Sequence, residues 1–474
     1  MFPPRHNEGT FRKSAGEGIT TIAIYVNNAG LINVEKGTLR FARGGVQNGI
    51  LNVPLGTAVE FSNDTFTFNS GSSNDLLGGV VLNGGTVVAE TNVTVILPSL
   101  TLSGGELQGS GDWTVNGLIL WTGGRIGGTG VLNANGGIAI SGSANKSLSR
   151  RTVNNGGTVT LTGSAGIGVG FGAVFNNLAG GLFDVQTDAD FIHQFGELMT
   201  FNNAGTFRKS AGATNEATIP QLLFRNSGLV EVLAGNLEFG QNSFRQTAGA
   251  TLLKGGNIQT KAPDHLRFAG GLVGGSGKVL MLYPTFDPFD IVVSGQLSPG
   301  LSAGRLEIQG DFSQPTAGSY NVEIGGTIAG TNYDQVAVTG YANLLGTINV
   351  VSINGFVPAL GDQFEIMKFN YHFGSVTFQG LDITNGISLL PVFSPTNLVL
   401  VATNAPLSVS PKMNLARNGD SFWLWWPLGY GGFNVQSTTN LNAPIPWSPV
   451  TPAEGNRHTF QSAEPMKFFR MISP

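Results

Sequence analysis

The chain lacks cysteine and is poor in charged residues. None of its 474 residues is Cys, which excludes a disulfide framework, a thiolate metal site and a cysteine nucleophile. Asp, Glu, Lys and Arg together make up only 11% of the residues, against about a quarter in ordinary globular proteins. Because 41% of the residues are hydrophobic, the low charge does not indicate a disordered chain.

Long apolar runs and basic clusters are also missing. No segment approaches the ~18 apolar residues of a membrane-spanning helix, and the first residues lack the apolar stretch of a secretion signal. The net charge is −4, and the basic pairs Arg12-Lys13 and Arg150-Arg151 stand alone in the sequence. Since a nucleic-acid site needs a basic stripe, the sequence predicts neither a membrane-spanning segment nor a nucleic-acid partner.

What the chain does contain is glycine and a long repeat. Glycine occurs 70 times, about twice its average usage, and together with Asn, Thr and β-branched residues it favours short strands joined by tight turns. Residues 7–16 (NEGTFRKSAG) return as residues 203–212 (NAGTFRKSAG), and residues 28–32 (NAGLI) return as residues 226–230 (NSGLV). The two blocks begin 28 − 7 = 21 residues apart in the first copy and 226 − 203 = 23 in the second. This period is typical of a solenoid, in which each coil stacks on its neighbours.

The sequence therefore predicts an all-β protein built on a right-handed parallel β-helix of roughly 13 coils. Glycine and asparagine are expected to supply positive φ at the corners, and asparagines of successive corners to stack as a hydrogen-bonded ladder. Alternating residues after each corner place every second side chain inside. The candidate core stacks are Phe66, Phe68, Phe175, Phe183, Phe201 and Phe207.

Three regions follow from the pattern. Residues 1–295 have the β-helix repeats. Residues 296–405 have longer alternating runs, which predict a β-rich cap, either an antiparallel sandwich or a widened end of the solenoid. After a linker at residues 405–411, residues 412–474 form a small C-terminal β module, which holds Trp423, Trp425, Trp426 and Trp447.

Several motifs resemble a known family. Residues 123–130 (GGRIGGTG) and 203–209 (NAGTFRK) resemble the coils of large secreted bacterial β-solenoid proteins, similar to autotransporter passengers. Residues 297–304 (LSPGLSAG), with residues 333–336 (YDQV), look like the module that often ends such solenoids, and residues 412–474 resemble a small module of bacterial surface proteins. The resemblance implies an extracellular or cell-surface protein. Because the repeat begins at Asn7 with no cap before it, we expect a C-terminal fragment or a misplaced start.

Candidate catalytic residues are few. A polysaccharide lyase or hydrolase needs converging carboxylates on one lateral face. The best groups are Asp184, Asp188 and Asp190, and Asp287 with Asp290, although both are also typical of solvated turns. Residues 300–304 (GLSAG) match a nucleophile elbow around Ser302, but the alternation that follows predicts a strand where the elbow requires a helix. The histidines lack metal-ligand spacing; they are His6, His193, His265, His372 and His458. No catalytic residue, cofactor or metal ligand is predicted.

Trp423 and Trp425 are the candidate ligand platform. Within residues 422–426 (FWLWW), strand alternation places Trp423 and Trp425 on one face and Phe422, Leu424 and Trp426 on the other. One face must be core. The other is either buried as well, since a module of about 60 residues needs large side chains to fill it, or a flat surface for sugar rings.

The sequence as a whole favours a non-enzymatic scaffold, a rigid solenoid stalk for a structural or adhesive role. Its expected partners are cell-surface polysaccharide or other surface proteins. One alternative is a polysaccharide-active β-helix enzyme, which would show at least three converging carboxylates and a cation. Another is a carbohydrate-binding protein that uses Trp423 and Trp425.

Overall fold

The computed structural model contains only β-strands in the residues that it describes. The described ranges are 5–212, 217–219, 222–240, 244–261, 266–282, 291–383, 386–404, 413–418, 421–425, 434–442, 445–450, 457–461 and 467–472. The chain divides into two compact units, Met1–Val292 with Glu307–Gly310, and Val293–Leu306 with Asp311–Pro474. No described segment forms a helix long and apolar enough to cross a membrane.

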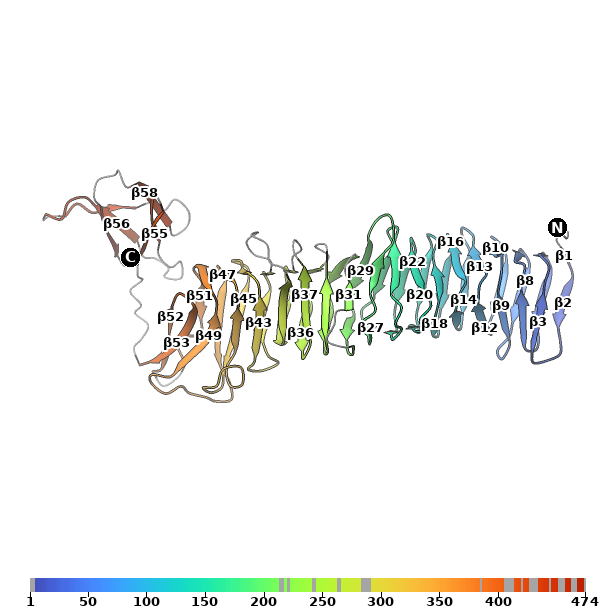
Figure 1. Cartoon of the computed structure of the whole chain (residues 1–474), viewed down its shortest axis with the longest axis horizontal. Coiled ribbons are helices and arrows are strands. Elements are labelled where there is room, and N and C mark those ends of the chain that lie inside the picture. The colour runs from blue at the N-terminus through green and yellow to red at the C-terminus, as the bar shows by residue number, and fades with distance from the viewer. Residues whose placement is uncertain are drawn as a thin grey trace. The chain divides into compact units, whose positions relative to one another are not determined.

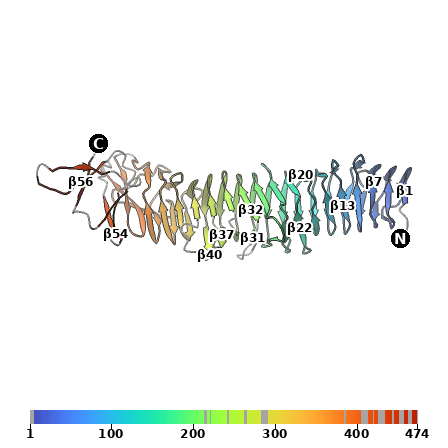
Figure 2. The same ribbon diagram turned by 90° about the horizontal axis from the view of Figure 1, so that it is seen from above.

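The first unit is a parallel β-solenoid, as the sequence predicts (Figures 1 and 2). One turn consists of β1 (Arg5–Asn7), β2 (Thr10–Lys13) and β3 (Ile19–Ile22), and the next of β4 (Val26–Asn28), β5 (Leu31–Val34) and β6 (Thr38–Phe41). Each strand pairs in parallel with the strand three further along, β1 with β4, β2 with β5 and β3 with β6. Successive turns therefore stack into three lateral surfaces, which we call faces 1, 2 and 3, and the solenoid has about 14 turns.

The remaining strands of the first unit follow the same order, one strand per face in each turn. Face 1 continues with β7 (Gly45–Gln47), β10 (Thr65–Phe68), β13 (Thr86–Ala89), β16 (Glu106–Gly109), β19 (Gly124–Ile126), β22 (Lys146–Ser149), β25 (Ile167–Gly170) and β28 (Phe191–His193), and a separate sheet takes this place in later turns, with β31 (Ala217–Ile219), β34 (Asn236–Phe239), β37 (Asn257–Lys261) and β40 (Lys278–Leu282). Face 2 continues with β8 (Ile50–Val53) and β11 (Ser73–Leu76), then with β14 (Thr94–Leu97), β17 (Asp112–Val115), β20 (Val131–Ala134), β23 (Thr152–Asn155), β26 (Val174–Asn177), β29 (Met199–Asn203), β32 (Leu222–Asn226), β35 (Phe244–Gln246) and β38 (Leu266–Phe268). Face 3 continues with β9 (Ala58–Phe61), β12 (Gly79–Leu82), β15 (Leu100–Leu102), β18 (Ile119–Trp121), β21 (Ile138–Ile140), β24 (Thr158–Leu161), β27 (Leu182–Val185), β30 (Thr206–Lys209), β33 (Leu229–Val232), β36 (Ala250–Lys254) and β39 (Leu272–Ser276).

The core is filled by inward side chains of all three faces, and its aromatic residues stack between turns. All six predicted core phenylalanines are at most 4% exposed. On face 2, the rings of Phe175, Phe201 and Phe224 lie nearly parallel, with centroids 5.0 and 5.1 Å apart. Phe183 and Phe207 stack in the same way on face 3, at 5.3 Å. The predicted core burial is confirmed for all six residues, and stacking between turns for Phe175, Phe183, Phe201 and Phe207, whereas Phe66 and Phe68 meet edge-on within β10 at 5.4 Å.

A buried ladder of side-chain amides follows the corner between faces 2 and 3. Asn155, Asn177, Asn203 and Asn226 each donate from Nδ2 to the side-chain oxygen of the next member, ending at Gln246, at distances of 2.8–3.0 Å. Each asparagine also donates to a backbone carbonyl of face 3 in the next turn. All five are at most 1% exposed. The predicted asparagine ladder is confirmed, and its place is inside the solenoid.

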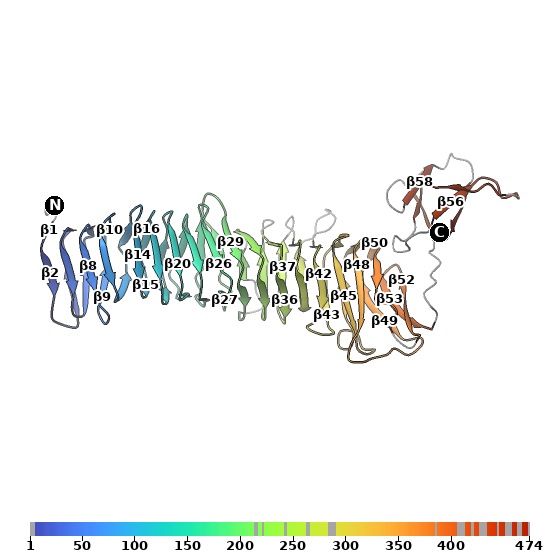
Figure 3. The same cartoon turned by 180° about the vertical axis from the view of Figure 1, so that it is seen from behind.

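A second amide ladder runs on the outer surface of face 2. Asn133, Asn154, Asn176 and Asn202 each donate to the preceding turn, and the chain of hydrogen bonds begins at the Thr114 hydroxyl. These side chains are half-buried. Figure 3 shows the strands β14, β20, β26 and β29 of this face.

The two copies of the repeated decapeptide occupy different corners. Residues 7–16 connect β1 on face 1 to β2 on face 2, whereas residues 203–212 connect β29 on face 2 to β30 on face 3. The motif is therefore specific to a corner geometry and can be used at either corner. The last glycine of each copy has positive φ, 78° at Gly16 and 123° at Gly212, as the sequence predicts for corners, whereas Gly9 and Gly205 do not. A Cβ on Gly30, Gly205 or Gly228 would lie 2.1–2.2 Å from a glycine carbonyl oxygen of the preceding turn, so close stacking is what requires glycine.

The second unit contains wider parallel turns and an antiparallel end. β42 (Gln296–Pro299), β45 (Ser319–Ile324), β48 (Thr347–Ser352) and β51 (Thr377–Gln379) pair in parallel, as do β44 (Phe312–Gln314), β47 (Tyr341–Leu344) and β50 (Tyr371–Gly374). β53 (Asn397–Thr403) pairs antiparallel with both β49 (Gln363–Lys368) and β52 (Ser388–Phe393). The second unit therefore combines parallel turns with antiparallel strands, and the choice between a sandwich and a widened solenoid end stays a prediction.

The C-terminal segment contains two small antiparallel sheets. One consists of β54 (Asn414–Asn418), β55 (Ser421–Trp425) and β58 (Arg457–Gln461), and the other of β57 (Ser448–Pro449), β56 (Asn434–Thr438) and β59 (Phe468–Ile472). Leu424 and Val435 form a small core, with Phe460 and Phe469 packed against them. The predicted linker at residues 405–411 lies outside the described residues.

Candidate functional site

Two of the three predicted carboxylates, Asp184 and Asp188, have different partners, and Asp190 directly precedes β28, where its backbone carbonyl accepts a hydrogen bond of 2.8 Å from the Ile167 N–H. Asp184 lies on β27 of face 3, and its Oδ2 accepts a hydrogen bond of 2.8 Å from Gln186. Asp188 lies in the loop after β27 and pairs with Lys209 Nζ at 3.0 Å. Lys209 is fully buried, and its ammonium also donates to two backbone carbonyls of the same corner. Asp188 therefore neutralises a buried structural lysine.

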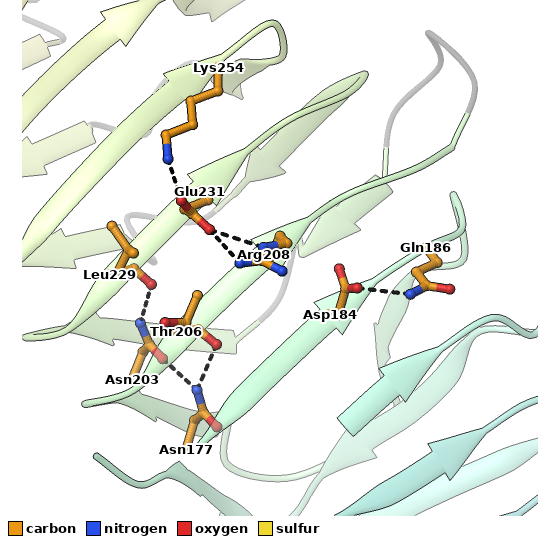
Figure 4. A network of polar contacts seen from close by, with 9 residues as sticks. All are labelled: Asn177, Asp184, Gln186, Asn203, Thr206, Arg208, Leu229, Glu231 and Lys254. Atoms are coloured by element: carbon orange, nitrogen blue, oxygen red, sulfur yellow. Dashed lines mark hydrogen bonds and ion pairs between the residues drawn. The ribbon is translucent and has the colours of Figure 1, made fainter. Parts of the chain in front are cut away.

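Face 3 carries a ladder of alternating charge at this level (Figure 4). Asp184 is in register with Arg208, and Arg208 with Glu231. The Arg208 guanidinium donates two hydrogen bonds to Glu231 Oε2, at 2.8 and 3.0 Å, and Lys254 Nζ donates to Oε1 at 2.7 Å. Burial opposes ionisation of Glu231, but the hydrogen bonds from Lys254 and Arg208 prevail and lower its pKa. Such a paired carboxylate is a structural ion pair rather than a proton donor at neutral pH.

The described residues contain no group of three His, Asp or Glu side chains placed to hold a metal ion. Asp287 and Asp290, the second predicted pair, lie outside the described residues, as does His265. His6, His193, His372 and His458 are on β1, β28, β50 and β58. Burial lowers the pKa of His372, which is in ring contact with Phe393 at 4.7 Å.

The nucleophile-elbow motif forms a structural loop. Ser302 is exposed, and the strand β43 (Arg305–Gln309) follows it, so the strand–turn–helix that the elbow requires is not formed. Asp334, which is 30 residues further along the chain than Gly304, accepts hydrogen bonds that hold this loop in place. Its Oδ1 accepts from the Gly304 N–H at 2.7 Å and its Oδ2 from the Glu323 N–H at 2.9 Å. The motifs at residues 297–304 and 333–336 are therefore two halves of one buried contact.

Asp334 makes the stability of the second unit depend on pH. Burial raises the pKa of Asp334 to about 7, although the backbone N–H groups of Glu323 and Gly304 favour ionisation. The folded protein thus binds a proton that the unfolded chain releases above about pH 4, and stability falls as pH rises from about 4 to 7. We expect residues 293–404 to resist proteolysis better at pH 5 than at pH 8 in equal denaturant. Asp334→Asn should flatten this dependence, and an unchanged slope in the variant would contradict it.

The two candidate tryptophans are on the central strand of a small sheet. Trp423 and Trp425 belong to β55, which pairs with β54 and β58, and Leu424 between them is 4% exposed. The side chains of Trp423 and Trp425 lie outside the described residues, as does Trp426. Trp447 packs under the Arg470 guanidinium, with 4.3 Å from its Cζ to the ring centroid.

Face 2 also carries a row of three arginines that the sequence motifs did not predict. Arg225, Arg245 and Arg267 are exposed on β32, β35 and β38 and are in register on adjacent turns. Each arginine is next to an inward phenylalanine, as in Phe224-Arg225, and the spacings of 245 − 225 = 20 and 267 − 245 = 22 residues match the coil period. The recurrence of arginine beside phenylalanine at the coil period could have predicted the row. Basic residues that are close together in the sequence could not, because the three arginines are 20 and 22 residues apart.

Comparison with known proteins gives no relative: no protein-family model matches the chain, and no curated protein matches its sequence.

Proposed function

We propose that the chain is a non-enzymatic structural or adhesion scaffold, secreted or displayed at the cell surface, in which the solenoid acts as a rigid stalk. The buried amide ladder from Asn155 to Gln246 is the observation that carries this proposal. It links successive turns by side-chain hydrogen bonds, in addition to the backbone hydrogen bonds of the parallel strands and the stacked phenylalanines. A structure in which each turn is bonded to the next on every face resists bending.

The engagement of the lateral carboxylates supports a non-enzymatic role. A polysaccharide-active enzyme needs carboxylates free to exchange protons or to bind a cation. On face 3, Asp188 and Glu231 are paired with cationic side chains. The ion pairs therefore favour a scaffold over the lyase or hydrolase alternative.

The test is a screen of the full chain for binding and turnover on an array of polysaccharides. The expected result is no release of reducing ends or unsaturated products from any polymer. Product release that is lost in Asp184→Asn would overturn the proposal in favour of the enzyme. The variant Trp423→Ala/Trp425→Ala is run in parallel, and loss of glycan binding in this variant alone would identify the C-terminal module as a sugar-binding platform. Labelling of intact source cells with antibodies against residues 5–212 tests surface display.

A further inference from the structure

Three arginines form a row along the solenoid axis on the outer surface of face 2. The register pairs Arg225 with Arg245 and Arg245 with Arg267. All three side chains are exposed, above the buried ring stack that includes Phe224 and Phe244. Neighbouring parallel strands are about 4.8 Å apart, so the guanidinium groups project from successive steps of one straight, regularly spaced row.

This row has no counter-charge on its own strands. β29, β32, β35 and β38 contain no Asp or Glu, and within the described part of the chain no hydrogen bond or ion pair joins the three guanidinium groups to another residue. Elsewhere in the same unit, arginines on neighbouring turns are paired, as Arg40 with Glu60 at 3.0 Å and Arg208 with Glu231 at 2.8 Å. Like charges directly opposite each other destabilise a sheet. Stability therefore does not account for the row.

The outer amide ladder leads directly into the arginine row. The register pairs Asn176 with Asn202 and Asn202 with Arg225, so the same line of outward positions changes from amides to guanidinium groups. Each ladder amide has a second N–H and further lone pairs beyond those used within the ladder. A guanidinium has five donors and no acceptor, so the arginines cannot continue the ladder among themselves. Their exposed donors are therefore available to acceptors from outside the row, which are water or a ligand.

We propose that Arg225, Arg245 and Arg267, continued by the outer amide ladder, bind a linear anionic polysaccharide that lies along the solenoid axis. Carboxylate and sulfate groups both accept the paired N–H donors of a guanidinium, and the amides suit sugar hydroxyls. Nucleic acid fits the row less well, because binding of single strands uses exposed aromatic rings for base stacking. The other outward positions of β29 and β32 are Thr200, Asn202 and Leu223. This binding site goes beyond the scaffold function and does not depend on it.

The experiment measures binding of the full chain to polygalacturonate and dextran sulfate, with neutral dextran and single-stranded DNA as comparison polymers, at about 50 and about 200 mM salt. The test variant is Arg225→Gln/Arg245→Gln/Arg267→Gln. The matched control is Arg12→Gln/Lys36→Gln/Arg43→Gln, whose three side chains are 58%, 55% and 66% exposed. Both variants change the net charge from −4 to −4 − 3 = −7. The control removes side chains that are paired with Glu35, Glu17 and Asp64, so it tests the effect of net charge on binding and not on stability.

We expect wild type and control to bind the anionic glycans, and the test variant to lose affinity by about tenfold or more. Binding should weaken with salt, and neutral dextran should not bind. An equal loss of affinity in both variants would mean that only the net charge matters, and it would overturn the proposed binding site. Unchanged binding in the test variant would overturn it as well. Tighter binding of single-stranded DNA than of polygalacturonate would overturn the assignment to a glycan.

Thermal unfolding, measured without and then with polygalacturonate, gives a second test of the row. Because the three side chains point outward and repel one another, the test variant should unfold at an equal or higher temperature than wild type at low salt. Adding polygalacturonate should raise the unfolding temperature of wild type and not that of the test variant. A rise of equal size in both would contradict the proposal.

Discussion

Replacing Arg151 with methionine should lower the free energy of unfolding of the first unit by about 3–5 kcal/mol. Arg151 is fully buried at the corner between faces 1 and 2. Its guanidinium donates to the Gly109 and Gly127 carbonyls at 2.9 and 2.5 Å, and to those of Gly111 and Val131 at 3.1 and 3.4 Å. These carbonyls belong to the two preceding turns, so one side chain satisfies acceptors on both. Methionine fills a similar space but has no N–H to donate to these buried carbonyls.

The charge of Arg151 survives its burial. Desolvation lowers the pKa of Arg151 to about 10, although Asp112 opposes the shift, so the side chain remains a cation at neutral pH. The adjacent residue supplies the matched control. Arg150 is exposed, has a φ of 64° and contacts the Phe171 ring at 5.0 Å from its Cζ. Arg150→Asn tolerates this backbone and should cost about 1 kcal/mol or less. Denaturant unfolding that shows similar losses in the two variants would contradict the carbonyl-binding role.

Replacing Asn177 with alanine should cost about 2–4 kcal/mol, whereas replacing its neighbour Asn176 should cost less than about 1 kcal/mol. Asn177 is fully buried and donates to Asn203 Oδ1 at 2.8 Å and to the Thr206 carbonyl at 2.9 Å. Alanine leaves both acceptors unpaired inside the solenoid and opens a cavity. Asn176 belongs to the half-buried outer ladder, where water can replace its lost hydrogen bonds.

The two variants test whether the inner ladder holds adjacent turns together. Hydrogen exchange of the amides in β26, β29 and β30 should accelerate strongly in Asn177→Ala and little in Asn176→Ala. Denaturant unfolding gives the corresponding free energies. Equal effects would mean that the inner ladder contributes no more than the outer one, and the proposed source of rigidity would then lose its basis.

Much of the architecture could be predicted from residues close together in the sequence. Alternation after each corner identifies the inward phenylalanines, because neighbouring residues of a strand point to opposite sides. The return of residues 7–16 as residues 203–212 identifies the coil. The candidate sites could not be predicted as well from the sequence. Asp184, Asp188 and Asp190 are close in the sequence, yet Asp188 is engaged by Lys209 from the next turn.

The sequence by itself determined the class of fold, the coil period and the residues of the core, since these depend on local alternation and on tight corners. Only the tertiary structure decided which residues meet across turns. Hydrogen-bonded asparagines of adjacent turns are 19 residues apart at Asn33 and Asn52 but 26 apart at Asn177 and Asn203. Because the turn length varies, a fixed offset cannot predict face or register. Only the stacking of the turns therefore decides that Arg151 is buried, which corner each repeat occupies, and that Arg225, Arg245 and Arg267 form a row.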